Sequence, residues 1–415
     1  NAYFPLFIPY SLLEKEKEHI KGFSPELAIV TVGGGEQLKD PLVVRPTSET
    51  IMYTMYAKWI HSWRDLPVLI NQWNNVVRWE KRTYLFLRTT EFLWQEGHTA
   101  HEDEKGAIEM ARKALEWYRE IYEDYYAMPV YLGTKSTAEK FAGAKTTYTV
   151  EALMPDGKAL QGATSHNLGQ NFSKPFDIHF QNREGKEDFV WQTSWGLSTR
   201  SLGGLFLTHG DDNGLVLAPK LAPTQVVIVP IQKTDEGKAE LASYCQSIKE
   251  TLLNGGVRVH MDHRDEPSIG RRFNEWELKG VPLRFEVGAK ELQSSTVTIV
   301  RRDTGVKVAI DQAQTLREAQ RFLDEIQTSL LNRAKKFLDE NTHDVANFEE
   351  FKNIMSSSRG FIRAFWCENG TCEAKIKEET KASTRCLPLD AKEEKGTCIH
   401  CSKPATHRWL FAQAY

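Results

Sequence analysis

The stretch that decides the fold is residues 76–98, VVRWEKRTYLFLRTTEFLWQEGH. Its composition predicts two strands, residues 75–80 and 89–98, joined by a charged loop. Side chains alternate between the faces of a strand, so one face of the second strand collects four of them: Phe92, Trp94, Glu96 and His98. Burying a carboxylate and an imidazole without partners is costly, which makes this a poor core face. It suits the wall of a pocket that holds a small cationic or amine ligand against aromatic rings.

Two arginines flank the predicted hairpin, Arg78 and Arg88. A pair of guanidinium groups suits the bidentate binding of phosphate oxygens. The alternative is a pair of surface arginines in scattered ion pairs. That alternative explains less well why both lie beside so many aromatic residues.

Further polar clusters occur in the same half of the chain. Residues 45–50, RPTSET, read either as a site or as a plain helix N-terminus, in which Thr47 or Ser48 caps and Glu49 complements the dipole. Glycines punctuate two other segments, QGATSHN at 161–167 and WGLSTRSLGG at 195–204, and they let backbone approach a ligand closely. Arg200 is expected one turn into a helix. The run of three glycines at 33–35 lacks the spacing of a phosphate loop and predicts a turn.

The length of 415 residues predicts about two to four domains. Residues 1–222 read as an α+β domain, in which helices pack beside an antiparallel sheet. Residues 223–325 alternate strands with helices, which predicts an α/β domain around a largely parallel sheet. Residues 326–415 read as a long charged linker helix followed by a small α/β domain.

The composition excludes several classes of protein. The net charge of −3 is incompatible with a globally basic nucleic-acid coat, although a local nucleic-acid site remains possible. No apolar run reaches the roughly 18 residues that span a membrane, so no membrane association is expected. Residues 2–9 already read as a core strand, and the chain starts at Asn1 without a Met. We therefore expect a fragment that lacks its N-terminal part.

Five of the six cysteines lie after residue 366. Two short pairs, Cys367 with Cys372 and Cys398 with Cys401, are separated by 25 residues and can form two knuckles around a tetrahedral Zn²⁺. Incidental or disulfide-bonded cysteines are the alternative, and His400 or His407 could replace one thiolate. Such a closed site would be structural. Cys386 is expected to be buried or free, and Cys245 to lie in the core.

Together these segments resemble a class II aminoacyl-tRNA synthetase, specifically prolyl-tRNA synthetase of the archaeal/eukaryotic-like type. The segments that carry the resemblance are residues 1–9 with Pro5 as the end of motif 1, 77–92 as motif 2, 196–200 as motif 3, and 45–49, 94–98 and 161–166 as prolyl signatures. Residues 223–325 resemble the anticodon-binding domain of this subgroup. The cysteine region and the terminal Tyr415 are similar to its extra C-terminal domain.

The resemblance implies ATP, L-proline, tRNA(Pro) and Mg²⁺ as ligands, a structural Zn²⁺, and a cytoplasmic enzyme. The implied catalytic residues are Arg78 for the α-phosphate, Arg200 for the triphosphate or adenine, and Glu91 for placing Mg²⁺. The implied ATP site comprises Arg78, Glu80, Arg88, Thr89, Phe92, Gln161, Ser198 and Arg200. The implied proline site comprises Thr47, Glu49, Arg78, Trp94, Glu96, His98, Phe141, Thr164 and His166, with Phe23 and Glu26 closing one side.

Anticodon contacts are expected from four residues: Phe273, Glu277, Arg284 and Lys290, by stacking and base-edge hydrogen bonds. An ordinary solvated helix face is an equally good interpretation of them. The Zn²⁺ ligands would be Cys367, Cys372, Cys398 and Cys401. The full-length protein is expected to be a homodimer, whereas this chain lacks the motif 1 helix that would build the interface.

Two rival functions remain open at this stage. A threonyl-tRNA synthetase would need a catalytic metal bound by Cys and His in the first domain, but the first 244 residues contain no Cys. A non-catalytic synthetase-like protein that binds tRNA or regulates a partner would be expected to lose the phosphate-binding arginines. Arg78, Arg88 and Arg200 are all present, which favours the enzyme.

Overall fold

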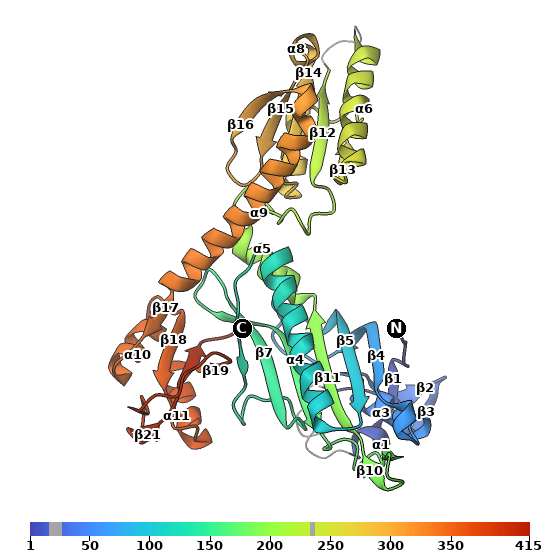
Figure 1. Ribbon diagram of the computed structural model, residues 1–415, viewed down its shortest axis with the longest axis vertical. Helices are drawn as coiled ribbons and strands as arrows, with labels where there is room; N and C mark the ends of the chain where they lie inside the picture. Colours follow the sequence, from blue (N-terminus) through green and yellow to red (C-terminus); the bar gives the residue numbers. More distant parts are fainter. Residues whose placement is uncertain (16–26, 233–236) are drawn as a thin grey trace. The chain divides into compact units, whose positions relative to one another are not determined.

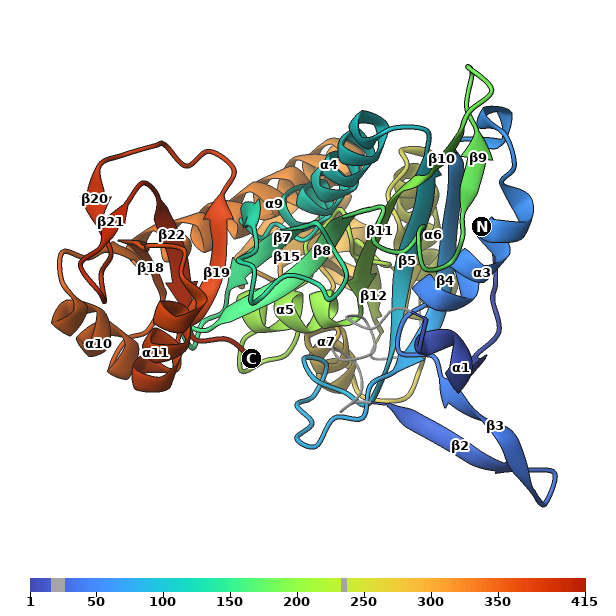
Figure 2. The same cartoon turned by 90° about the horizontal axis from the view of Figure 1, so that it is seen from below.

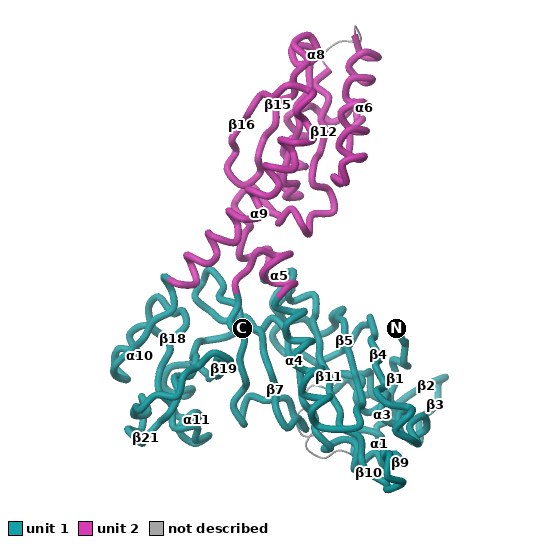
Figure 3. The backbone as a smooth tube through the Cα atoms, in the orientation of Figure 1, with its two compact units in different colours: residues 1–119, 130–204, 340–415 teal, residues 120–129, 205–339 magenta. Residues whose placement is uncertain are grey.

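The computed structural model describes residues 1–15, 27–232 and 237–415. The chain forms two compact units (Figure 3). The first comprises residues 1–119, 130–204 and 340–415, and the second comprises residues 120–129 and 205–339. The division into domains at residues 1–222, 223–325 and 326–415, which the sequence analysis expects, remains a prediction.

A ten-stranded sheet organises the first unit (Figure 1). Its strands, in spatial order, are β17 (Thr342–Asp344), β18 (Phe361–Phe365), β22 (Arg408–Ala412), β19 (Ser383–Pro388), β6 (Tyr131–Thr134), β7 (Thr146–Leu153), β8 (Ala159–Gly169), β11 (Trp191–Ser198), β5 (Glu91–His101) and β4 (Val68–Val77). Every neighbouring pair is antiparallel except β17 with β18. The predicted antiparallel sheet is confirmed.

The C-terminal region extends this sheet through the pairing of β19 with β6, in which Leu387 lies opposite Thr134 and Pro388 opposite Gly133. Gly133 permits the approach, because a Cβ there would lie 2.4 Å from the Leu387 carbonyl oxygen and 2.6 Å from the Cys386 side chain. The sequence did not predict that the cysteine region and the first domain share one sheet.

Helices cover both faces of the central strands. On one face α3 (Glu49–Trp59) packs its buried Met52, Tyr53 and Tyr56 against Phe172 and Phe180. On the other face α4 (Glu104–Glu120) buries a stripe of small and apolar residues and contacts β8, where the Ser165 hydroxyl donates to a carbonyl of α4. Helix α3 ends at Trp59 because Ile60 is extended, and a 3-10 turn, η2 (Trp63–Asp65), follows. A π-helical turn, η3 (Ile121–Tyr125), follows the end of α4.

Smaller elements complete the first unit. They are β1 (Phe7–Pro9), β2 (Ala28–Gly33), β3 (Glu36–Val44), α1 (Tyr10–Leu13), β9 (His179–Gln181), β10 (Glu187–Phe189), α10 (Phe348–Ser356), α11 (Gly370–Thr380), β20 (Gly396–Thr397) and β21 (Pro404–Ala405). The glycine run is the hairpin turn between β2 and β3, with φ of +62° at Gly34 and +87° at Gly35, as predicted (Figure 2). Helix α5 (Arg200–His209) begins at Arg200, so the expectation that Arg200 lies one turn inside it is wrong.

The second unit contains a five-stranded sheet, in the order β13 (Val259–Met261), β12 (Val226–Ile231), β14 (Leu283–Gly288), β15 (Thr296–Arg301) and β16 (Lys307–Asp311). Its helices are α6 (Lys238–Asn254), α7 (Ile269–Leu278), α8 (Ala289–Ser294), η4 (Gln312–Gln314) and α9 (Thr315–Glu340). The first three strands are parallel, but β14, β15 and β16 pair antiparallel, so the sheet is less parallel than predicted. The reason is that only a short turn at residues 302–306 joins β15 to β16, whereas parallel neighbours need a long crossover.

Candidate active site

A cavity of about 340 Å³ opens within the first unit, and its walls come from β5, β8, β11, the loop after β4 and the start of α3. The described residues that are expected to bind ATP and proline all line it: Thr47, Glu49, Arg78, Glu80, Arg88, Thr89, Phe92, Trp94, Glu96, His98, Phe141, Gln161, Thr164, His166, Ser198 and Arg200. Segments more than 100 residues apart in sequence therefore meet around one space.

One predicted catalytic residue, Glu91, lies outside the cavity wall. It starts β5, and its carboxylate accepts a hydrogen bond from the Asn75 amide at 2.7 Å. Its expected role in placing Mg²⁺ stays a prediction. Phe23 and Glu26 lie outside the described residues.

One end of the cavity offers oxygen acceptors. Thr47 and Glu49 are buried at the start of α3, and the Thr47 hydroxyl donates to Glu49 Oε2 at 2.5 Å. The helix interpretation of this segment is also correct, since Glu49 lies in the first turn of α3, where a carboxylate suits the helix dipole. The same residues therefore serve the helix and present acceptor oxygens to the cavity.

Glu96 is the centre of a buried hydrogen-bond network. Its side chain is 1% exposed and accepts from Asn74 Nδ2 at 2.7 Å, from Gln72 Nε2 at 3.0 Å and from His98 Nε2 at 2.9 Å. The Ser48 hydroxyl and backbone N–H also point to it. Burial opposes the charged form of Glu96, but these donors outweigh burial and lower its pKa below the usual value. The buried carboxylate is thus ionised and ties the start of α3 to β4 and β5.

Two histidines in the wall have pKa values that are shifted in opposite directions. Burial disfavours the imidazolium of His98, but Glu96 and nearby Glu49 outweigh it and raise the pKa of His98. Burial lowers the pKa of His166 to about 3, and the positive charges of His98 and Arg78 act in the same direction. The surroundings of His98 therefore favour its imidazolium form beside Glu96, whereas His166 is neutral and stacks 4.5 Å from the Phe141 ring.

Guanidinium groups approach the remaining wall. Arg78 donates to the Pro46 carbonyl at 3.2 Å and lies over the rings of Phe92 and Trp94, so it stands beside the acceptor end. Arg200 donates to the Leu87 carbonyl at 2.7 Å. Arg88 pairs with Glu80 at 2.7 Å, as the ion-pair interpretation expects, although both still face the cavity.

The wall also carries polar groups that a ligand could satisfy. Within the part of the chain that the structure describes, the buried Trp94 Nε1 and Ser194 Oγ have no hydrogen-bond partner. A buried donor without a partner costs free energy, so a bound polar ligand would be stabilised by meeting either group.

The sequence did not assign several lining residues to the site, and Tyr415 is the most instructive. Its hydroxyl donates to Asp156 Oδ1 at 2.6 Å, and Lys158 lies over its ring. Its ring also lies 5.8 Å from that of Tyr84 in the loop after β4. No local pattern in the sequence predicts that Tyr415 lies at the cavity, because its position depends on the sheet that the C-terminal strands share with the first domain. The other unassigned lining residues are Phe86, Leu87, Glu139, Thr147, Gly162, Ala163, Ser194, Trp195 and Gly196.

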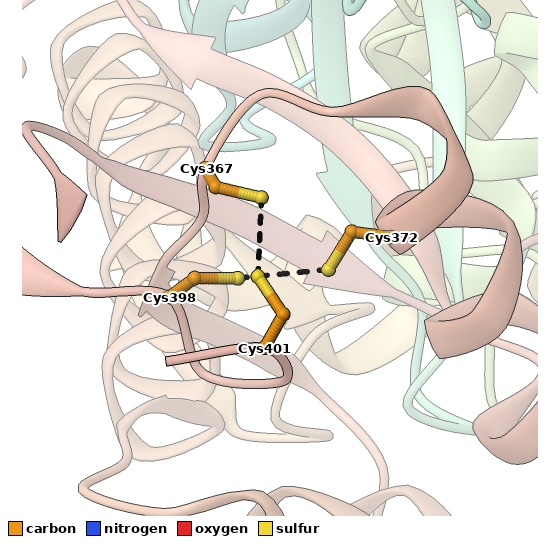
Figure 4. Close-up of side chains that lie close together, drawn as sticks. All are labelled: Cys367, Cys372, Cys398 and Cys401. Carbon is orange, nitrogen blue, oxygen red and sulfur yellow. Dashed lines mark hydrogen bonds between the residues drawn. The ribbon is translucent and has the colours of Figure 1, made fainter. Parts of the chain in front are cut away.

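The two cysteine pairs converge in the C-terminal part of the first unit (Figure 4). The four sulfur atoms lie within 4.8 Å of one another, with Cys372 to Cys398 at 3.6 Å and Cys367 to Cys401 at 3.5 Å. A tetrahedral Zn²⁺ with Zn–S bonds of about 2.3 Å requires sulfur separations of about 3.8 Å, so the cluster fits this ion.

The protonation of this cluster also fits a cation. A backbone N–H from Lys403 lowers the pKa of Cys401 to about 7, whereas burial and neighbouring sulfurs raise the pKa of Cys372. Four thiolates this close repel one another unless a cation neutralises them. His400 lies beside the group, with Nδ1 3.6 Å from the Cys372 sulfur, and its other nitrogen faces Glu379. Cys386 and Cys245 are buried and outside the cluster, as predicted.

In the second unit the four anticodon candidates are only partly brought together. Arg284 lies 4.4 Å from the centre of the Phe273 ring and shares a small cavity with Glu277. Lys290 lies in the first turn of α8, beyond the C-terminal end of β14, whereas Arg284 lies near the start of that strand. Their role in reading an anticodon stays a prediction.

An antiparallel sheet with this cavity defines the class of the protein. Residues 31–208 match the family model of the tRNA synthetase class II core domain (G, H, P, S and T), and residues 225–321 match the anticodon binding domain. Residues 348–415 match the C-terminal domain of prolyl-tRNA synthetase. The chain is therefore built as a class II aminoacyl-tRNA synthetase.

Whole-chain relatives narrow the class further. The chain is 50% identical over 417 residues to the Proline--tRNA ligase of Natranaerobius thermophilus, covering 100% of this chain and 86% of that protein. It is 51% identical over 423 residues to the Proline--tRNA ligase of Prosthecochloris aestuarii, covering 100% and 87%. It is 50% identical over 421 residues to the chloroplastic/mitochondrial Proline--tRNA ligase of Arabidopsis thaliana, covering 100% and 77%. The chain belongs to the prolyl-tRNA synthetase family.

Proposed function

We propose that the chain is a proline--tRNA ligase, which activates L-proline with ATP and transfers the prolyl group to tRNA(Pro). One observation carries this proposal: a single cavity joins the buried acceptors Thr47 and Glu49 to the guanidinium groups of Arg78 and Arg200. A secondary ammonium fits the acceptors, and a polyphosphate fits the arginines.

The reaction proceeds by displacement at phosphorus. An oxygen of the prolyl carboxylate attacks the α-phosphorus of ATP, the bond to the bridging oxygen breaks, and pyrophosphate leaves with that electron pair. A hydroxyl at the 3′ end of the tRNA then attacks the prolyl carbonyl, and AMP leaves. This chemistry needs positioning and charge neutralisation more than a protein nucleophile.

Each wall of the cavity has a role in this scheme. Thr47 and Glu49 accept hydrogen bonds from the prolyl ammonium, and Trp94, His98 and Phe141 shape the ring pocket. Arg78, which stands beside the acceptor end, neutralises charge developing on the α-phosphate. Phe92 stacks on the adenine ring, and Glu80 accepts a hydrogen bond from the adenine amino group. The nucleotide is held by Arg88, Thr89, Ser198 and Arg200. Gln161 bridges both substrates, and Thr164 and His166 contact the prolyl carboxylate.

Bound Mg²⁺ would supply further neutralisation of the phosphates, with Glu91 proposed to help place it. The four cysteines Cys367, Cys372, Cys398 and Cys401 would hold a structural Zn²⁺, which would leave no open position for chemistry. In the second unit Phe273, Glu277, Arg284 and Lys290 are proposed to contact the anticodon.

We also propose that the full-length protein forms a homodimer, and that the exposed face of β4 and β5 contributes to its interface. Leu69, Trp73 and Leu93 lie on this face and are 59%, 67% and 61% exposed. Three large apolar side chains that share one sheet face form a surface that a second copy would cover.

A cytoplasmic location is proposed on the basis of the translation substrates. None of the helices in the described ranges is long and apolar enough to cross a membrane.

Amino-acid-dependent ATP–pyrophosphate exchange across all twenty amino acids tests the proposed activity. Exchange that depends on proline is the expected result. Exchange with another amino acid and none with proline would make the prolyl assignment wrong. Exchange with none of them would favour a non-catalytic tRNA-binding role.

A further inference from the structure

The segment at residues 135–141 lies between two functional parts of the first unit. It follows β6 and leads towards β7, and two of its residues, Glu139 and Phe141, line the active-site cavity. On its other side it contacts α11, the helix that carries Cys372 of the cysteine cluster. The same short segment therefore forms both a cavity wall and a contact with the C-terminal region.

Its contact with α11 is a buried polar group of three side chains. Ser136, Glu373 and Thr384 are 3%, 4% and 0% exposed. The Ser136 hydroxyl donates to Glu373 Oε1 at 3.0 Å, and Thr384 Oγ1 lies within hydrogen-bonding distance of both. Burial raises the pKa of Glu373 although both hydroxyl groups donate to it, and these hydrogen bonds give the contact a specific geometry.

Hydrogen bonds continue from Ser136 into the cavity wall. The Ser136 hydroxyl accepts from the backbone N–H of Glu139 at 3.2 Å, which fixes the turn. The backbone N–H of Phe141 then donates to Thr147 Oγ1 at 3.0 Å, and that oxygen lies 3.0 Å from His166 Nδ1. Phe141 also stacks on His166. A shift of Ser136 therefore reaches the side chains proposed to surround the proline ring.

The opposite end of the cavity is built from other elements. Arg88 belongs to the loop after β4, and Arg200 begins α5. A disturbance of residues 135–141 should therefore affect the binding of proline more than the binding of ATP.

A separate buried contact joins the C-terminal strands to the sheet. Glu151 on β7 pairs with Lys135 at 2.7 Å and with Arg385 on β19 at 2.9 Å, and all three are buried. This triad and the pairing of β19 with β6 do not involve Ser136 or Glu373. Removing the Ser136–Glu373 bond should thus alter the cavity wall without detaching the C-terminal region.

We propose that Ser136 and Glu373 are positioning residues that couple helix α11 to the proline end of the cavity. This proposal rests on the proposed function. The two residues act through the turn at 136–139 and through Phe141, and they touch no substrate. The C-terminal region thereby sets the affinity of the enzyme for its amino acid.

The test compares the full-length variants Ser136→Ala, Glu373→Ala and the double variant in ATP–pyrophosphate exchange. Each single variant should raise the KM for proline about 2- to 30-fold, the range typical of coupling between connected sites, with little change in the KM for ATP or in kcat. The double variant should resemble the single ones, because both substitutions break the same bond. Glu373→Gln retains an acceptor oxygen for Ser136 and should preserve most of the affinity.

The control is Glu378→Ala on the exposed side of α11, which should behave as wild type. Thermal melting of each variant establishes that it is folded, and quenching of tryptophan fluorescence by proline gives an independent affinity. An unchanged KM for proline, an equal rise in the KM for ATP, or additive effects in the double variant would overturn the coupling while leaving the proposed function intact. A wild-type protein without proline-dependent exchange would overturn both.

Discussion

Replacing Glu96 by alanine should be the most damaging single change in the cavity. The substitution removes the carboxylate that pairs with His98 at 2.9 Å and that accepts from Gln72 and Asn74. All of these side chains are buried, so the charge on His98 and the amide donor of Asn74 would lose their carboxylate partner, whereas the Gln72 amide would keep its bond to the Ser48 hydroxyl. Breaking a buried ion pair by removing one partner costs about 3–5 kcal/mol. We expect a loss of that size in the free energy of unfolding of the first unit.

Urea unfolding followed by tryptophan fluorescence measures this loss. Trp276 is the only tryptophan in the second unit, so fluorescence reports mainly on the first. The matched control is Glu109→Gln, a carboxylate that is 68% exposed on α4, which should change the free energy by no more than about 0.5 kcal/mol. A loss below about 1 kcal/mol for Glu96→Ala would refute the view that Glu96 is the ionised centre of the network.

Three further predictions address the arginines, the ion pair and the cysteine cluster. Arg78→Ala should lower the rate of proline-dependent exchange about 10²- to 10³-fold, the usual cost of losing a group that stabilises developing charge, whereas the exposed Arg183→Ala should have no effect. Because the pKa of His98 is raised in the folded protein, the ion pair with Glu96 contributes fully to the free energy of unfolding below pH 6.5. This contribution is lost as the pH rises through the folded-state pKa of His98. The variant His98→Asn should abolish this pH dependence in urea unfolding. Cys398→Ser should reduce bound zinc from one per chain to nearly none in metal analysis, whereas Cys245→Ser should retain it.

Each of these has a contradicting outcome. Equal losses of exchange in the Arg78 and Arg183 variants would show a nonspecific effect of charge. Stability that rises with pH above 6.5 would mean that His98 is neutral in the folded protein. Unchanged zinc content in the Cys398 variant would exclude the four-sulfur site.

The site could be predicted from the sequence where the pattern is local. The alternation of residues along β5 places Phe92, Trp94, Glu96 and His98 on one face, and the structure brings all four to the cavity. The cysteine cluster could also be predicted, because the two cysteines of each pair lie within a few residues of each other in the sequence. The start of α5 at Arg200 was missed by one turn, since helix ends depend on contacts such as that with the Leu87 carbonyl.

Contacts between distant segments could not be predicted. Tyr415 reaches the cavity because β19 pairs with β6, and Gly133 allows this pairing only through the absence of a Cβ. The partners of Glu96 come from two strands and a helix start, so the alternation shows that its face is polar without showing what satisfies it. A single sequence contains the strand pattern but not the register that joins strands.

The most direct test of the account is a structure of the protein with a non-hydrolysable analogue of prolyl-adenylate in which a sulfamoyl group replaces the phosphate. The account predicts the prolyl nitrogen within hydrogen-bonding distance of Thr47 and Glu49, the sulfamoyl group at Arg78, and the adenine against Phe92. An analogue bound outside this cavity, or with the adenine at Thr47 and Glu49, would contradict it.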